Sequence, residues 1–418
     1  MLCYDEGDLQ EEQLIEVNGK KYRLDTPPIV GICVDGTDPS YLAAANGLMP
    51  NLTRMAAQGA SGILQSVVPS YTNPNNIAIA TGVTSDVNGI CGNFYYDQDT
   101  GKEVMMNDPH YLRCNTLFAA FAQAGREVAV ITAKEKLRRL LGNNLKGICF
   151  SVECAMEATV KEHGIENVAQ LVGASAPGIY DPEASIYCLQ AGAVLLEKNL
   201  ADFLYLSTTD FVQHKYPPGS SVANNFYGSL DKVLGRLDAT GAIIALTADH
   251  GMNQKTLEDG SPRVQFLEIL LAEAGFPKAS VLLPITDPYV IHHGALGSYA
   301  TVYMLNGDAP RAAQVLRSVP GVDLVLTREE AVARFHLPPD RIGDLVVLGD
   351  EHTTFGRTPE WHDLSAVKTG LRSHGGLHER NVPFVINRPL ASEYAGRLAS
   401  GQGNNYELFD FALNGVRS

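Results

Sequence analysis

The 418-residue chain lacks several features that mark whole classes of protein. No apolar run approaches the roughly 18 residues that a membrane-spanning helix needs. The first thirteen residues, MLCYDEGDLQEEQ, are acidic and largely polar, so a secretory signal peptide is not expected. The seven cysteines are odd in number and form no Cys-x-x-Cys pair, which argues against a disulfide framework or a cysteine zinc site. A cytoplasmic protein without membrane partners is therefore expected.

Positive charge is also scarce. The chain has 32 Lys and Arg residues against 47 Asp and Glu, for a formal net charge of −15. This balance argues against a nucleic-acid partner. A site for a small anionic substrate must then be locally cationic, and bound metal ions are one way to achieve that. The sequence does not specify an oligomeric state and leaves a homodimer open.

Apolar, β-branched runs alternate with amphipathic helical patterns along most of the chain. The runs predict strands at Ile29–Val34, Val128–Thr132, Phe203–Ser207, Ile243–Thr247 and Val382–Ile386. The helical patterns fall at Leu52–Gln58, Leu117–Ala124, Ala191–Lys198 and Phe226–Leu237. Such alternation is typical of an α/β fold with a mainly parallel central sheet flanked by helices.

The alternation stops between residues 253 and 369. This stretch holds a helical pattern at Val264–Ala274, an extended segment at Tyr299–Met304 and a polar loop at Gly349–Glu360. We interpret residues 253–369 as an inserted, smaller α+β cap. Residues 1–252 and 370–418 would then form the metal-binding catalytic core.

Acidic and histidine side chains follow several of the predicted strands. Asp35 follows the first strand, Asp210 and His214 follow a later one as Asp-x-x-x-His, and Asp249-His250 follow the next. Any one of them alone is more often a helix cap or a solvated turn. Together they meet at the carboxyl edge of the sheet, where α/β proteins bind ligands. We expect them to form a site for two metal ions.

A hydroxyl-rich segment, Pro-Ser-Tyr-Thr72-Asn-Pro-Asn-Asn, precedes an apolar run. Pro74 is well placed in the first turn of a helix, with Thr72 or Asn73 in the cap region. Thr72 is either a simple helix cap or a nucleophile whose hydroxyl is activated at a helix N-terminus and on a metal. The sequence alone leaves both interpretations open.

Taken in order, these motifs resemble the alkaline phosphatase superfamily, and most of all its nucleotide pyrophosphatase/phosphodiesterase branch, which uses a threonine nucleophile. The resemblance rests on Asp35, the Thr72 segment, Asp210-Phe-Val-Gln-His214, Thr-Ala-Asp249-His250-Gly and Ser-His374-Gly-Gly. It implies an alkaline phosphatase-like core with two Zn²⁺ ions, although Mn²⁺ or Fe²⁺ would also suit such ligands. One ion would be bound by Asp210, His214 and His374, and the other by Asp35, Thr72, Asp249 and His250.

Three further segments resemble the phosphonoacetate hydrolase family within that branch. They are Ser-Thr-Thr-Asp-Phe-Val-Gln-His-Lys, Thr-Ala-Lys134-Glu-Lys136-Leu and Tyr-Val-Ile-His292-His293-Gly-Ala-Leu-Gly-Ser-Tyr. The resemblance implies that Lys134 and Lys136 hold the substrate carboxylate, and that Asn93 and His214 contact the substrate. It implies zinc-dependent hydrolysis of the C–P bond of phosphonoacetate to acetate and phosphate, through a phosphothreonine intermediate on Thr72.

Other interpretations of the same residues stay open. A phosphodiesterase or nucleotide pyrophosphatase would share every metal ligand and differ in its leaving-group pocket. A cofactor-independent phosphoglycerate mutase relative would use a serine, which Thr72 does not match. A metal- and phosphate-binding protein without turnover is the third alternative. Five further histidines are assigned outside the metal sites: His292 and His293 to packing, His352 and His362 to the cap surface, and His378 to the surface or the surroundings of the metal site.

Overall fold

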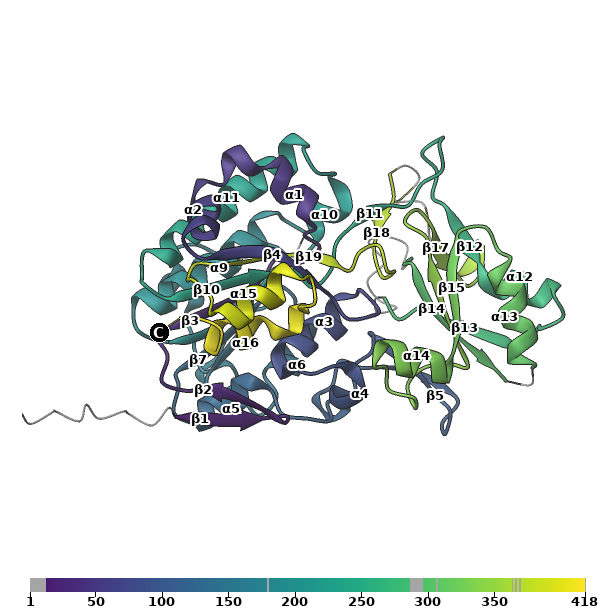
Figure 1. Cartoon of the computed structure of the whole chain (residues 1–418), viewed down its shortest axis with the longest axis horizontal. Helices are drawn as coiled ribbons and strands as arrows, with labels where there is room; N and C mark the ends of the chain where they lie inside the picture. Colours follow the sequence, from purple (N-terminus) through teal and green to yellow (C-terminus); the bar gives the residue numbers. More distant parts are fainter. Residues whose placement is uncertain are drawn as a thin grey trace, which may run out of the picture.

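The computed structural model describes residues 13–178, 180–285, 296–305, 307–362, 364, 367 and 370–417. Figure 1 shows a large α/β body and, on its right, a smaller lobe built around its own sheet. His292 and His293 lie outside the described residues. No described helix is both long and apolar enough to cross a membrane.

The large body is built on a seven-stranded sheet in the order β4-β19-β10-β3-β9-β7-β8. Neighbouring strands from β10 to β8 are parallel, and β19 is the one strand of this sheet that runs antiparallel to the others. The prediction of a mainly parallel sheet is confirmed. The strands are β3 (Ile29–Cys33), β4 (Ala60–Gln65), β7 (Val128–Thr132), β8 (Ile148–Ser151), β9 (Phe203–Ser207), β10 (Ile243–Thr247) and β19 (Asn381–Ile386).

Helices cover both faces of this sheet (Figure 1). All four helices predicted for this body are present, three of them longer than their patterns suggested. One face carries α1 (Pro39–Ala44), α2 (Pro50–Gln58), α9 (Glu183–Glu197) and α11 (Ser221–Asp238). The other carries α3 (Thr72–Thr81), α5 (Leu117–Gln123), α6 (Glu135–Leu141) and α16 (Leu408–Leu413).

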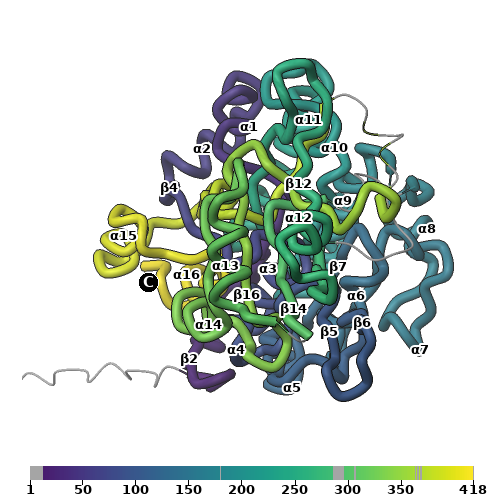
Figure 2. Tube along the Cα trace, turned by 90° about the vertical axis from the view of Figure 1, so that its right-hand side faces the viewer, coloured from purple at the N-terminus to yellow at the C-terminus, as the bar shows by residue number. Residues whose placement is uncertain are grey.

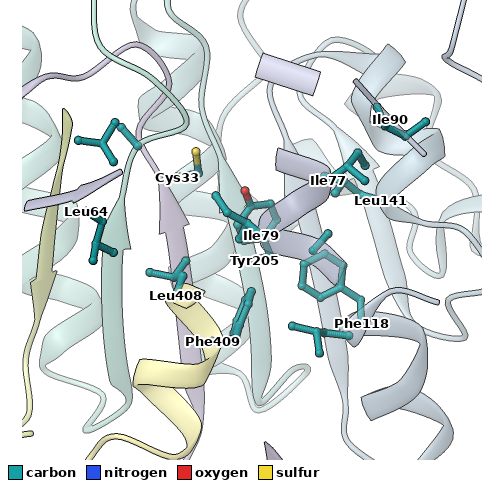
Figure 3. Close-up of a cluster of buried hydrophobic side chains, with 14 of the residues drawn as sticks. Cys33, Leu64, Ile77, Ile79, Ile90, Phe118, Leu141, Tyr205, Leu408 and Phe409 are labelled. Carbon is teal, nitrogen blue, oxygen red and sulfur yellow. The ribbon is translucent and has the colours of Figure 1, made fainter. Parts of the chain in front are cut away.

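An aromatic stack fills the core between the sheet and the second helix layer (Figure 3). The rings of Phe203 and Phe409 stack with centroids 5.0 Å apart, and Phe118 meets Phe409 edge-on at 5.7 Å. Gly31 in β3 lies beneath this stack, where an added Cβ would approach Phe409 to 2.6 Å. The C-terminal helix can therefore pack directly onto the central strand.

The smaller lobe has a four-stranded antiparallel sheet in the order β13-β14-β16-β15 and a core of its own. Its strands are β13 (Ala279–Leu282), β14 (Tyr299–Met304), β15 (Val322–Thr327) and β16 (Leu345–Gly349). Figure 2, viewed from this side, shows α12 (Leu267–Glu273) and α13 (Ala309–Arg317) in front of the core body. The predicted α+β cap is present as a lobe, while its boundaries at residues 252 and 370 stay a prediction.

Three details of the cap prediction were wrong. The helix begins at Leu267, because Val264–Phe266 forms strand β12, which pairs with β17 (Thr354–Gly356). The predicted polar loop therefore contains a strand. His362 is buried rather than on the surface, and its Nε2 accepts a hydrogen bond from the Arg357 backbone N–H at 3.1 Å.

Candidate metal centre

The candidate site lies at the carboxyl edge of the parallel strands. Asp35 follows β3, Lys134 follows β7, Asp210 follows β9, and Asp249-His250 follow β10. Because these strands are adjacent and point the same way, residues far apart in the chain meet at one edge. His374 reaches the same place from the loop that precedes β19.

Within the described residues, two buried groups could each hold a metal ion. One is Asp35, Asp249 and His250, and the other is Asp210, His250 and His374; in each group the ligand atoms lie within 4.8 Å of one another. His250 Nε2 lies 3.3 Å from Asp35 Oδ1 and 3.8 Å from Asp249 Oδ2. His250 thus belongs to both groups, whereas the sequence had assigned it to one site only.

His214 adds a third imidazole on the Asp210 side. The two residues lie one turn apart at the start of α10 (Phe211–Lys215), and His214 Nε2 is 2.9 Å from Asp210 Oδ2. His374 Nε2 is 3.8 Å from the same oxygen. The structure therefore brings together all three residues predicted for this ion.

The tautomers of the three imidazoles fit metal binding. The Nδ1 atom of each ring faces a backbone carbonyl oxygen: that of Arg372 for His214 at 2.8 Å, that of Gly251 for His250 at 2.9 Å, and that of Ser70 for His374 at 2.7 Å. A carbonyl can only accept, so Nδ1 carries the proton. Each Nε2 then presents its lone pair to the cluster, as in histidine ligands of metals.

Hydrogen bonds also orient the Asp249 carboxylate. Asp249 Oδ1 accepts hydrogen bonds from the Gly36 and His250 backbone N–H groups, and its Oδ2 accepts one from Asn76 Nδ2 at 3.1 Å. Among the described residues, the buried Asp35 Oδ2 forms no hydrogen bond, and its ion-pair contact is with Lys134 Nζ at 3.5 Å. A buried carboxylate oxygen left in this state fits a cation as its partner.

The charges buried in this cluster shift the pKa values of its members. Burial and the neighbouring Asp35 carboxylate raise the pKa of Asp249 well above its usual range. Burial lowers the pKa of His250, but Asp249 and Asp35 outweigh it and raise that pKa to about 9. Burial and the nearby His250 and His214 hold the pKa of His374 well below its usual range. Divalent cations would supply the charge that this cluster attracts.

Lys134 enters this cluster. Its Nζ lies 2.9 Å from Asp210 Oδ1 and 3.5 Å from Asp35 Oδ2. Burial lowers its pKa, but those two carboxylates outweigh burial and raise it above the usual range. Lys136, further along the same wall, has its pKa lowered to about 8 by burial and by the Lys134 charge.

The Thr72 hydroxyl also reaches the cluster. Thr72 is the first residue of α3, and its side chain does not cap the helix; Tyr71 occupies the cap position. Thr72 Oγ1 lies 3.3 Å from His250 Nε2 and 3.5 Å from Asp35 Oδ1. Its hydroxyl thus lies at both a helix N-terminus and the metal-binding group, as the nucleophile interpretation requires.

A pocket of about 740 Å³ opens over this edge, between the core body and the cap. Its wall includes the predicted nucleophile, Thr72, and all four predicted substrate-binding residues, Asn93, Lys134, Lys136 and His214. Asn93 is anchored through its backbone, whose N–H donates to the Pro284 carbonyl at 3.1 Å. The predicted residues therefore share one pocket.

Comparison with known proteins places this geometry in a family. The family model for type I phosphodiesterase/nucleotide pyrophosphatase matches residues 29–377. The chain belongs to this family. Among curated relatives, ectonucleotide pyrophosphatase/phosphodiesterase family member 3 from Bos taurus is 31% identical over 85 residues. That match covers 20% of this chain and only 10% of the relative's length.

Solved structures extend the likeness to the whole chain. Phosphonoacetate hydrolase from Sinorhizobium meliloti 1021, in complex with phosphonoformate, is 47% identical, with a TM-score of 0.93. The match covers 97% of this chain and 100% of that one. Murine ectonucleotide pyrophosphatase/phosphodiesterase 5 in complex with AMP is 16% identical, with a TM-score of 0.62 and coverage of 94% and 96%, and shows the shared fold. The resemblance to phosphonoacetate hydrolase that the motifs indicated is confirmed.

Several residues of the site were not found from the sequence. Asn76, which orients Asp249, and Arg372, whose carbonyl orients His214, contact ligands that lie far away in the chain. The one sequence signal for Asn76 is that it lies in the same segment as Thr72, four residues further on. His378 was assigned to the surface or the surroundings of the metal site, and it lies at the surface, where its Nε2 is 2.7 Å from Asp323 Oδ2.

Proposed function

We propose that this chain hydrolyses the C–P bond of phosphonoacetate to acetate and phosphate. One observation carries the proposal: the 47% identity and 0.93 TM-score to a phosphonoacetate hydrolase extend over nearly the whole chain. A related crystal structure, 46% identical, holds phosphonoacetate itself. The pocket beside the metal-binding groups, with two lysines in its wall, supports a small dianionic or trianionic substrate.

Two divalent ions would be held here, one by Asp210, His214 and His374 and one by Asp35, Thr72, Asp249 and His250. These ligands are carboxylate and hydroxyl oxygens and imidazole nitrogens, which suit Zn²⁺ and would also fit Mn²⁺ or Fe²⁺. When bound, the ions supply positive charge for the phosphoryl oxygens and the attacking and leaving atoms of an in-line displacement.

Thr72 acts as the nucleophile. Its Oγ1 attacks phosphorus, the hydroxyl proton leaves, and the C–P bond breaks with its electron pair on carbon. The products of this step are a phosphothreonine and the acetate carbanion, which takes a proton. Water then attacks phosphorus, releasing phosphate and restoring the Thr72 hydroxyl. The position of Thr72 at the start of α3 supports this role, because the helix N-terminus favours negative charge on Oγ1.

The leaving group is the difficult part of this reaction. A carbanion next to a carboxylate is stabilised as an enediolate, provided that cations lie beside it. Lys134 and Lys136 fill that role. The contact of Lys134 with Asp210 and Asp35 supports it, because a substrate on the metal-binding groups would meet this ammonium. Asn93 donates its amide to a phosphonate oxygen, and His214 contacts the substrate from the Asp210 side.

The test is phosphate release from phosphonoacetate by the zinc-loaded protein, beside p-nitrophenyl phosphate and a nucleotide diester. Thr72→Ala should abolish turnover while metal content is unchanged. A Lys134→Ala/Lys136→Ala double variant should lose phosphonoacetate turnover. Lys215→Ala is the matched control, since Lys215 lines the same pocket but stacks over Phe211 at 4.6 Å. Retained turnover in Thr72→Ala would refute the scheme.

A phosphodiesterase is the second candidate. The pocket continues past the lysines to the aromatic rings of Tyr180 and Phe211, whose centroids are 6.1 Å apart, so it has room for a larger leaving group. Faster release from the nucleotide diester than from phosphonoacetate would favour this function. The Thr72 nucleophile would stand, and the role of the lysines would not.

We also propose a cytoplasmic location and the division into core and cap at residues 252 and 370. The six described cysteines are all free, which supports a reducing compartment. The separate hydrophobic core of the cap supports the division. A homodimer would be tested by the mass of the protein in solution.

A further inference from the structure

Two oppositely charged residues lie wholly buried beside the metal-binding groups, and the reaction described above does not use them. Lys255 is 0% exposed and Glu379 is 1% exposed, and Lys255 Nζ lies 2.8 Å from Glu379 Oε1. Burying such a pair strips both ions of their hydration, and it often adds little to stability. General stability alone is therefore a weak reason for burying this pair.

The pair joins three segments of the chain. Glu379 Oε1 accepts hydrogen bonds from Lys255 Nζ and from Asn253 Nδ2, the latter at 2.7 Å. Lys255 Nζ also donates to the Glu351 carbonyl, in the cap, at 2.7 Å. Glu379 Oε2 accepts from the Gly376 backbone N–H at 2.9 Å. Both oxygens of the Glu379 carboxylate therefore accept hydrogen bonds.

One route leads from Glu379 to His374. The Gly376 carbonyl accepts the Ser70 hydroxyl at 2.9 Å, and the Ser70 carbonyl faces His374 Nδ1 at 2.7 Å. Gly375, between them, has a φ of 116°, and a Cβ there would lie 2.3 Å from the Tyr71 ring. The turn after His374 therefore packs tightly against the segment that leads to Thr72. Glu379 fixes the end of this turn through the Gly376 backbone N–H.

A second route leads from Glu379 to His250. The Glu379 carbonyl accepts the Gly251 backbone N–H at 2.7 Å. The Gly251 carbonyl in turn faces His250 Nδ1 at 2.9 Å. The His250 and His374 rings stack with centroids 3.5 Å apart and an interplanar angle of 7°. Glu379 is therefore connected to both stacked imidazoles: to His374 through its side chain and to His250 through its backbone carbonyl.

We propose that Glu379, held in place by Lys255, is a positioning residue that sets the orientation of His374 and His250 for metal binding. The inference rests on the metal centre of the proposed function and not on the substrate. Its consequence is that Glu379 controls how tightly the protein holds metal. Residues that orient metal ligands from behind typically change metal affinity by about 10–100-fold when they are mutated.

The test measures two quantities for each zinc-loaded variant. One is the rate at which the protein releases zinc to a chelator, and the other is its melting temperature. Glu379→Gln keeps the side-chain shape but turns one carboxylate oxygen into an NH₂ group, which must face a donor. We expect it to release zinc at least about tenfold faster than the wild type. It should also melt lower, because Lys255 is left as an unpaired buried charge.

Two further variants separate positioning from stability. Lys255→Met/Glu379→Gln removes the unpaired charge, so it should regain melting temperature while zinc release stays fast. Arg126→Met removes a partly buried cation that pairs with Asp202 at 3.0 Å, at the opposite end of the strands. It should melt lower but release zinc at the wild-type rate.

The outcomes are distinct. Wild-type zinc release from Glu379→Gln, or recovery of both zinc retention and melting temperature in the double variant, would overturn the proposal. Failure of a wild-type protein with two bound zinc ions to act on phosphonoacetate would refute the proposed function and leave the role of Glu379 standing. A wild type that binds no zinc would overturn both.

Discussion

The pH dependence of phosphonoacetate turnover should depend on Lys136. Burial and the Lys134 charge lower the pKa of its ammonium to about 8. A lysine with a lowered pKa is charged below that value and loses its charge as the pH rises through it. If Lys136 holds the substrate carboxylate, only the charged form binds. The value of kcat/KM should therefore be level near pH 7 and fall above pH 8.

The size of the effect follows from this pKa. Between pH 7 and pH 9, the charged fraction of a group with a pKa of 8 falls about tenfold, and kcat/KM, which reports groups of the free enzyme, should fall by the same factor. Lys136→Met should lower kcat/KM at pH 7 by about a hundredfold, equivalent to about 2.7 kcal/mol for a lost charge pair.

Two variants make the assay specific to Lys136. Arginine keeps its charge throughout this range, so Lys136→Arg should remove the fall above pH 8. Lys134→Gln removes the neighbouring charge, so the pH at which the fall begins should rise. The measurement is phosphate release from phosphonoacetate between pH 6.5 and 9.5 in the zinc-loaded protein. A profile in Lys136→Arg identical to that of the wild type would refute the reasoning, because another group would then be titrating.

Three further outcomes are expected. Asn93→Ala should lower kcat by about 10²–10³-fold with unchanged zinc content, because it removes one amide donor to the phosphonate; a change in KM alone would contradict this. Phe409→Ala should lower the free energy of unfolding by about 3–5 kcal/mol in urea titrations, since the buried ring stacks on Phe203 and packs over Gly31; a loss below about 1 kcal/mol would show that the core refills the space. Chelation should lower the melting temperature, because metal at a thousandfold excess over its Kd contributes about 4 kcal/mol, and an unchanged melting curve would argue against a metal bound at this cluster.

The fold was predictable where burial is local and uniform. The strands Val128–Thr132, Phe203–Ser207 and Ile243–Thr247 were predicted with the bounds that the structure has. Strands buried on both faces of a parallel sheet are continuous apolar runs, and polar residues end them sharply. Helix α9 was predicted too short at its N-terminal end. It is buried on nearly all sides, so its first turns show little amphipathic contrast.

The cap was less predictable because its elements depend on distant partners. Val264–Phe266 continues a helical pattern but pairs as a strand with Thr354–Gly356, about ninety residues away in the chain. The same pairing placed a strand inside a polar segment and buried His362 next to it. Local propensity is a weak guide wherever such long-range contacts decide the conformation.

The candidate residues of the site could be named from the sequence alone. Asp35, Thr72, Asp210, His214, Asp249, His250 and His374 could be selected because each follows a recognisable strand or sits in a recognisable motif, and parallel strands bring such residues to one edge. How these residues are shared between the two metal-binding groups, and what orients them, depends on contacts made in the folded chain. It placed His250 in both metal-binding groups, brought Lys134 to Asp210, and buried Lys255 and Glu379 behind the imidazoles. Those contacts join segments far apart in the chain, and no local pattern of polarity records which of them will meet.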